Sequence, residues 1–72
     1  MGQDIKSHVG GTVKEVKVAS KDQVTTGQTV IVVQQSGKSD VNINAPSSGI
    51  IDDVKVKVGD TVSEGTVVAV QA

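Results

Sequence analysis

The sequence predicts an all-β domain built from two similar units. The chain has sixteen valines and five isoleucines but no leucine, phenylalanine, tyrosine or tryptophan, so its core must consist of β-branched side chains. These side chains favour strands and lose rotamer freedom in helices. A shift of 38 residues also aligns the chain with itself, from Ile5 on Ile43 to Val32 on Val70. A two-fold repeat in so short a chain predicts two β units packed against each other.

Hydrophobic patterning places strands at matching positions in the two halves. Residues 12–18 alternate between polar and apolar, residues 22–28 contain turn formers, and residues 29–33 form an apolar run. The second half repeats this plan with alternation over 50–58, a turn over 59–65 and a strand over 66–70. One more strand, over 40–45, ends at Pro46, which cannot donate to a ladder.

The repeat also predicts which residues are structurally equivalent. Gly27 and Gly65 should adopt similar backbone conformations, as should Asp22 and Asp60 in the loops before them. We expect the core to be formed by five pairs of valines, one from each half: Val16/Val54, Val18/Val56, Val24/Val62, Val30/Val68 and Val32/Val70.

Length and charge exclude several classes of function. Residues 1–72 make a single small domain with little chain left to enclose a catalytic cleft, which favours a carrier or adaptor over an enzyme. A formal charge of -1 and the absence of aromatic residues argue against nucleic-acid binding. There is no membrane-length apolar run and no hydrophobic signal segment, so we expect a cytoplasmic protein. We also expect the isolated domain to be monomeric.

No catalytic or metal-binding set stands out. His8 is the only histidine, the chain has no cysteine, and the adjacent Asp52 and Asp53 point to opposite faces of a strand. The triplet from Gly37 to Ser39 resembles the end of a phosphate-binding P-loop. That reading fails because the first glycine of the motif would fall at Val32, inside a strand, and no helix follows.

The one segment that repeats nothing joins the two halves. Residues 34–40 connect two predicted strands, and Lys38 lies near their middle. Gly37 and Lys38 as central residues suit a type II′ turn, because glycine at the first central position accepts a positive φ. The sequence therefore predicts a hairpin that displays Lys38.

Several motifs together resemble the biotinyl/lipoyl attachment domain family over nearly the whole chain. In that family the modified lysine lies eight residues before the proline of an Ala-Pro-x-x-Gly turn, and Lys38 lies eight residues before Pro46. The resemblance is carried by Gly11-Thr12-Val13, Asp22-x-Val24-x-x-Gly27-Gln28, Asn42-Ile43-Asn44-Ala45-Pro46-x-x-Gly49 and Gly59-Asp60-x-Val62-x-x-Gly65.

The resemblance implies a flattened barrel, or sandwich, of two four-stranded antiparallel sheets with pseudo-two-fold symmetry. It implies covalent attachment of biotin to Lys38 on a hairpin at one end, with both termini at the other, and with Gly37 and Ser39 shaping recognition by a biotin protein ligase. The carrier would then move carboxyl groups between a biotin carboxylase and a carboxyltransferase. A cofactor on a tethered arm reaches successive active sites at high effective concentration.

The residues beside Lys38 depart from both branches of the family. Biotin carriers typically read Glu-Ala-Met-Lys-Met and lipoyl domains Asp-Lys-Ala, whereas this chain reads Gln35-Ser36-Gly37-Lys38-Ser39. The family motifs elsewhere in the chain favour biotin over lipoate. Because the flanking residues differ from those of biotin carriers, we expect Lys38 to be modified slowly. Two alternatives stay open. One is a lipoyl carrier, loaded by a lipoyl ligase and serving a 2-oxoacid dehydrogenase-type complex. The other is an unmodified structural or interaction module.

Overall fold

The computed structural model describes residues 2–72, which form eight β-strands and no helix. The all-β prediction is therefore confirmed. In chain order the strands are β1 (Gln3–Lys6), β2 (Gly11–Val16), β3 (Gln23–Val24), β4 (Thr29–Gln34), β5 (Val41–Asn44), β6 (Gly49–Val54), β7 (Thr61–Val62) and β8 (Val67–Gln71).

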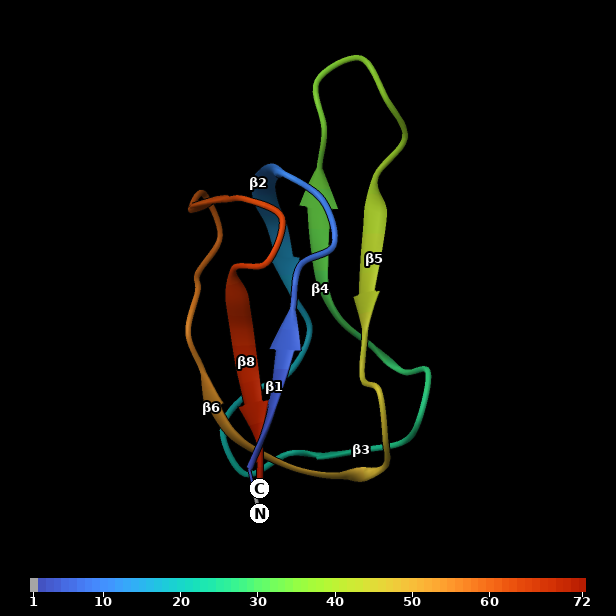
Figure 1. The fold of residues 1–72 in the computed structure, drawn as a ribbon, viewed down its shortest axis with the longest axis vertical. Coiled ribbons are helices and arrows are strands. Elements are labelled where there is room, and N and C mark those ends of the chain that lie inside the picture. The colour runs from blue at the N-terminus through green and yellow to red at the C-terminus, as the bar shows by residue number, and fades with distance from the viewer. Residues whose placement is uncertain (1) are drawn as a thin grey trace.

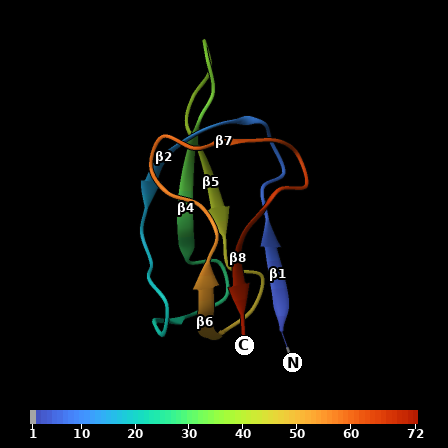
Figure 2. The ribbon, with the colours of Figure 1, turned by 90° about the vertical axis from the view of Figure 1, so that its left-hand side faces the viewer.

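The strands form two antiparallel four-stranded sheets that face each other (Figures 1 and 2). One sheet has the order β1-β8-β6-β3 and the other β5-β4-β2-β7. In each sheet the two central strands come from one half of the chain and the two edge strands from the other half. The halves are therefore interlocked, and neither can complete a sheet alone.

Backbone hydrogen bonds follow the 38-residue repeat. The N–H of Gly27 donates to Ala45, and the N–H of Gly65 donates to Ser7, which is the repeat equivalent of Ala45. The two glycines have φ values of 84° and 91°, so the predicted similarity is confirmed.

The two loop aspartates are equivalent in the same way. Asp22 Oδ2 accepts a hydrogen bond from the backbone N–H of Ala19 at 2.9 Å, and Asp60 Oδ2 accepts one from that of Lys57 at 3.0 Å. Each carboxylate thus closes the loop that precedes a short strand. The prediction for these aspartates is also confirmed.

The core lies between the sheets and contains most of the predicted valines. Five of these valines are buried in the core and three pack against it half-buried. The buried ones are Val18, Val24, Val30, Val62 and Val68, and the half-buried ones are Val16, Val54 and Val56. The core also includes residues that the valine pairing omitted: Ile5, Val13, Ile31, Val33, Ile43, Ala45, Ile51 and Ala69.

The predicted core pair Val32/Val70 is wrong in part: Val32 is buried, at 5% exposed, and Val70 is half-buried, but neither packs between the sheets. Val32 is opposite Glu15 on one side and Asn42 on the other, and directly paired residues share a face of the sheet. Because Glu15 and Asn42 are exposed, Val32 lies on the outer face, and Val70 holds the equivalent position between Asp4 and Asp53. Neither valine belongs to the core cluster.

Strand ends also differ from the predicted ranges. The alternating segments 12–18 and 50–58 remain strands only as far as Val16 and Val54. Each is interrupted by a β-bulge, which bends a strand and increases its twist. The two-residue strands β3 and β7 lie inside segments predicted as turns, because pairing with β6 and β2 recruits them into the sheets.

Candidate functional site

The hairpin between β4 and β5 projects from one end of an elongated molecule measuring 36 × 18 × 18 Å (Figure 1). Both termini lie at the opposite end. The repeat explains this arrangement, because the strands equivalent to β4 and β5 are β8 and β1, which stop at the termini. The loop that connects β4 to β5 therefore has no counterpart in the repeat.

The turn at the tip differs from the predicted one. The N–H of Lys38 donates to the carbonyl of Gln35 at 3.3 Å, so the central residues are Ser36 and Gly37. Gly37 has a φ of 72° at the second central position, as a type II turn requires. The predicted type II′ turn centred on Gly37 and Lys38 is thus wrong by one residue. The predicted need for glycine at position 37 is nevertheless correct, because Gly37 has a positive φ.

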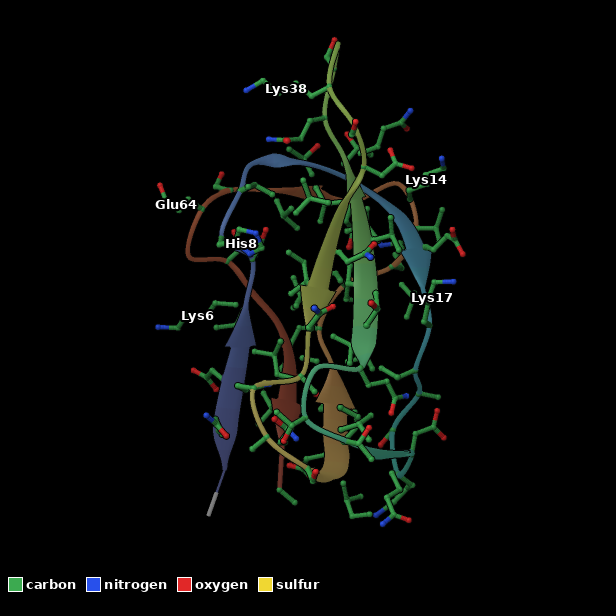
Figure 3. All side chains as sticks on the ribbon, turned by 90° about the vertical axis from the view of Figure 1, so that its right-hand side faces the viewer. Lys6, His8, Lys14, Lys17, Lys38 and Glu64 are labelled. Atoms are coloured by element: carbon green, nitrogen blue, oxygen red, sulfur yellow. The ribbon has the colours of Figure 1, made fainter. Side chains whose placement is uncertain are left out.

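Lys38 is exposed near this tip, and its side chain extends away from the strands (Figure 3). Within residues 2–72 its amine forms no ion pair with a carboxylate, a property it shares with Lys6 and Lys21. The other lysines are engaged by acids in the pairs Lys14–Asp40, Lys17–Glu15, Lys55–Asp53 and Lys57–Asp60.

Two side-chain contacts hold the base of the hairpin. Lys14 of β2 donates to Asp40 with a distance of 2.7 Å between Nζ and Oδ2, which connects β2 to the outgoing arm. On the incoming arm, Gln35 Nε2 donates to the carbonyl of Gly10 at 3.3 Å. The hydrogen bond and the charge of Asp40 raise the pKa of Lys14. Both arms of the hairpin are thus tied to the segment that enters or forms β2.

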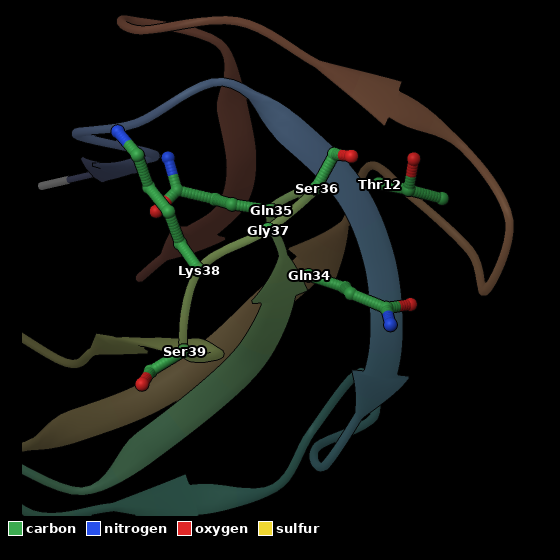
Figure 4. A pocket seen from close by; sticks show the side chains of 7 residues that line it. All are labelled: Thr12, Gln34, Gln35, Ser36, Gly37, Lys38 and Ser39. Atoms are coloured by element: carbon green, nitrogen blue, oxygen red, sulfur yellow. The ribbon is translucent and has the colours of Figure 1, made fainter.

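An open hollow lies beside the hairpin, and the residues that line it are all polar or glycine (Figure 4). It runs from β2 to the turn, and its lining residues are Thr12, Gln34, Gln35, Ser36, Gly37, Lys38 and Ser39. The three site residues predicted from the sequence, Gly37, Lys38 and Ser39, therefore lie together on one exposed surface. Lys38 is exposed in the described part of the chain, so a large acyl group can reach its amine.

Comparison with known proteins agrees with this geometry. A family model for biotin and lipoyl domains, described as "Biotin-requiring enzyme", matches residues 1–70. The biotinylated protein TB7.3 homolog of Mycobacterium leprae is 34% identical over 70 residues, which cover 97% of both chains. The chain belongs to the biotin/lipoyl attachment family. Domains of this family are carriers of a covalently attached cofactor rather than catalysts.

Relatives of this attachment domain come from both branches of the family. The acetyltransferase component of the pyruvate dehydrogenase complex of Cupriavidus necator, named for a dihydrolipoyllysine residue, is 34% identical over 67 residues. That match covers 93% of this chain but 12% of the relative. The urea carboxylase of Kluyveromyces lactis contains a domain that superposes with a TM-score of 0.92 at 28% identity, covering 100% of this chain and 6% of that one.

The structure also shows residues around the β4–β5 hairpin that sequence reasoning missed. Lys14, Asp40 and Gln35 were not singled out, because their contacts join segments far apart in the chain. The sequence nevertheless marks Lys14 and Asp40, because the 38-residue repeat pairs each of them with a residue of a different kind. Lys14 aligns with Asp52, and Asp40 aligns with Gly2.

Within residues 2–72 no helix of this attachment domain is long and apolar enough to span a membrane.

Proposed function

We propose that Lys38 is the residue of this domain that carries the cofactor, and that the cofactor is biotin. The observation that supports it most is the position of Lys38, which lies on the one loop that has no repeat equivalent, at the end farthest from the termini. Its amine is exposed and free of carboxylate partners within the described residues, as acylation by a ligase requires.

The residues of the site have simple roles in this proposal. Gly37 allows the turn, Ser39 begins the outgoing arm, and the two-sheet scaffold keeps the hairpin away from the domain body. Attached biotin would supply carboxyl transfer, while the protein supplies presentation. The partners are a biotin protein ligase, a biotin carboxylase and a carboxyltransferase, and a cytoplasmic location belongs to the same proposal.

Lipoate is the second candidate, because the domain aligns over 93% of its length with a component named for a lipoylated lysine. Biotin remains the first candidate because the family motifs favour it and because the biotinylated protein of Mycobacterium leprae matches over 97% of both chains. With lipoate, the partners would be a lipoyl ligase and the enzymes of a 2-oxoacid dehydrogenase-type complex.

Co-expression with a biotin ligase, followed by avidin blotting and intact-mass measurement, tests the proposal. Wild type should gain one biotin, and Lys38→Arg should gain none. Lys6→Arg and Lys21→Arg are matched controls, since these lysines also lack carboxylate partners in the described chain. A signal that survives Lys38→Arg would show that another lysine is used.

A parallel co-expression with a lipoyl ligase and lipoate decides between the cofactors. Mass gain only in this arm would replace biotin by lipoate. No mass gain in either arm would favour an unmodified interaction module.

A further inference from the structure

The ion pair between Lys14 and Asp40 interrupts the symmetry of the molecule. Two other pairs, Lys17–Glu15 and Lys55–Asp53, are repeat equivalents of each other, at 3.0 and 2.9 Å. Lys14–Asp40 has no such counterpart, because the equivalent positions hold Asp52 and Gly2. Lys57–Asp60 also lacks a counterpart, since Lys57 aligns with Ala19, but it lies within the loop that precedes β7. Among the unrepeated pairs in the described residues, Lys14–Asp40 is the one that contacts the hairpin.

Lys14 occupies an unusual place in the sheet. The pairing of β2 with β4 shifts register between Val13 and Glu15, which leaves Lys14 as the extra residue of a β-bulge. A bulge re-aims a side chain away from the regular alternation. Here the side chain of Lys14 ends at Asp40, with β4 lying between β2 and the arm that leads into β5.

Asp40 is two residues from Lys38, on the same arm of the hairpin. Residues two apart in an extended chain are about 7 Å apart and can point to the same side. A free carboxylate at position 40 would therefore be within reach of the Lys38 amine. An ion pair with it would hold the amine in its charged form, which does not attack an acyl group.

We propose that Lys14 is a positioning residue for Lys38: it binds the carboxylate of Asp40, anchors the outgoing arm of the hairpin, and keeps that carboxylate away from the attachment amine. Glu15, the other acid beside Lys14, is itself paired with Lys17. The inference rests on the proposal that Lys38 is the attachment residue. It concerns the chemical reactivity of the Lys38 amine, which can be measured without attaching a cofactor.

Competitive acetylation tests this without any ligase. The folded protein is treated with a trace of an acetylating reagent at low ionic strength, and mass spectrometry gives the labelling of Lys38 relative to Lys6. We expect Lys14→Gln to lower this ratio about two- to fivefold, the range typical of one exposed ion pair. Lys14→Arg should retain the wild-type ratio, because arginine can still bind Asp40.

The double variant Lys14→Gln/Asp40→Asn separates capture of the amine from loosening of the hairpin. It has no free carboxylate at position 40, so the ratio should return to the wild-type value. Lys55→Gln, which removes the pair with Asp53, is the control and should leave the ratio unchanged. An unchanged ratio in Lys14→Gln, or an equal fall in the double variant, would overturn the inference. Failure of biotinylation or lipoylation would instead overturn the proposed function alone.

Discussion

Lys21 and Gly59 occupy equivalent positions and share a left-handed backbone conformation, with φ values of 79° and 95°. The N–H of Lys21 donates to Ile51 at 2.8 Å, and that of Gly59 donates to Val13 at 2.9 Å. Ile51 and Val13 are themselves equivalent. The fold therefore requires a positive φ at both places, and only the second half of the chain supplies glycine.

We expect Lys21→Gly to stabilise the domain by about 0.5–1 kcal/mol, because a non-glycine residue is strained in this conformation. Gly59→Lys should destabilise it by about 1 kcal/mol for the same reason. Urea denaturation of both variants measures the free energy of unfolding. Opposite signs are the expected result, and a loss of stability in Lys21→Gly would contradict it.

The two faces of β4 predict different losses in the free energy of unfolding when a valine on each face is replaced by alanine. Val30 is 0% exposed and belongs to the core cluster, whereas Val32 is 5% exposed but lies outside that cluster, paired with Glu15 and Asn42 on the outer face. Val30→Ala should cost roughly 2–3 kcal/mol through lost burial and the cavity that remains, and Val68→Ala should behave alike. Val32→Ala should cost about 1 kcal/mol or less. Equal losses in thermal or urea unfolding would contradict this assignment of faces.

Gly11 and Gly49 are equivalent by repeat but should respond differently to alanine. A Cβ atom at Gly11 would lie 2.5 Å from the carbonyl oxygen of Gln34 and 2.7 Å from Cγ1 of Val33. At Gly49 the nearest atom would be Nε2 of Gln71, at 3.4 Å. Gly11→Ala should therefore cost roughly 1–3 kcal/mol by overpacking, and Gly49→Ala less than about 1 kcal/mol.

Gln34 is the last residue of β4, so the Gly11→Ala variant should also disturb the base of the hairpin. Amide exchange of residues 34–40 would show this as lost protection. If Gly49→Ala proved the more damaging of the two, the close approach at Gly11 would not be a packing constraint.

Acid should weaken the loop that Asp60 closes. The hydrogen bond from the backbone N–H of Lys57 lowers the pKa of Asp60, and the Lys57 ammonium 3.3 Å away acts in the same direction. Because this pKa lies below the unfolded value of about 3.9, protons bind preferentially to the unfolded chain. The stabilisation is present above pH 4 and is lost as the pH falls through the folded value.

We therefore expect Asp60→Asn to lose less stability than wild type between about pH 5 and pH 2. Unfolding measured at several pH values gives this slope. Asp52→Asn is a suitable control, since that carboxylate forms no ion pair or hydrogen bond within residues 2–72. A slope unchanged by Asp60→Asn would mean that the hydrogen bond does not persist in solution.

The residues beside Lys38 should limit the rate of biotinylation. Ligases of the resembling family usually meet methionine on both sides of the lysine, so the double variant Gly37→Met/Ser39→Met should be modified faster than wild type. Gly37 has a positive φ, however, and methionine there strains the turn. Ser39→Met alone is the cleaner change and should speed modification roughly 3- to 10-fold, equivalent to about 1 kcal/mol of added apolar contact. Initial rates with a purified ligase measure it, and a slower Ser39→Met variant would contradict the idea.

The sequence by itself determined the strands β2, β4, β5, β6 and β8, the two-fold repeat and the position of Lys38 on a hairpin, but it did not indicate β1, β3 or β7. These features depend on local or periodic information: β-branched side chains, turn-forming Gly27 and Gly65, and a segment that repeats nothing. The need for glycine at position 37 was also readable, because a tight turn requires a positive φ in either turn type.

Only the tertiary structure decided how the halves interlock and which valines face the core. A register shift at a bulge changes which face a residue occupies, and alternation alone cannot reveal it. Packing also decided what the residues that break the repeat contact.

Gln71, the equivalent of Val33, is 2% exposed, donates to the carbonyl of Ser47 at 2.8 Å, and has no partner for Oε1 within the described residues. Lys14 reaches Asp40 across β4, a contact between residues 26 apart in the chain. Such pairings arise when strands distant in sequence become neighbours, so no local pattern encodes them.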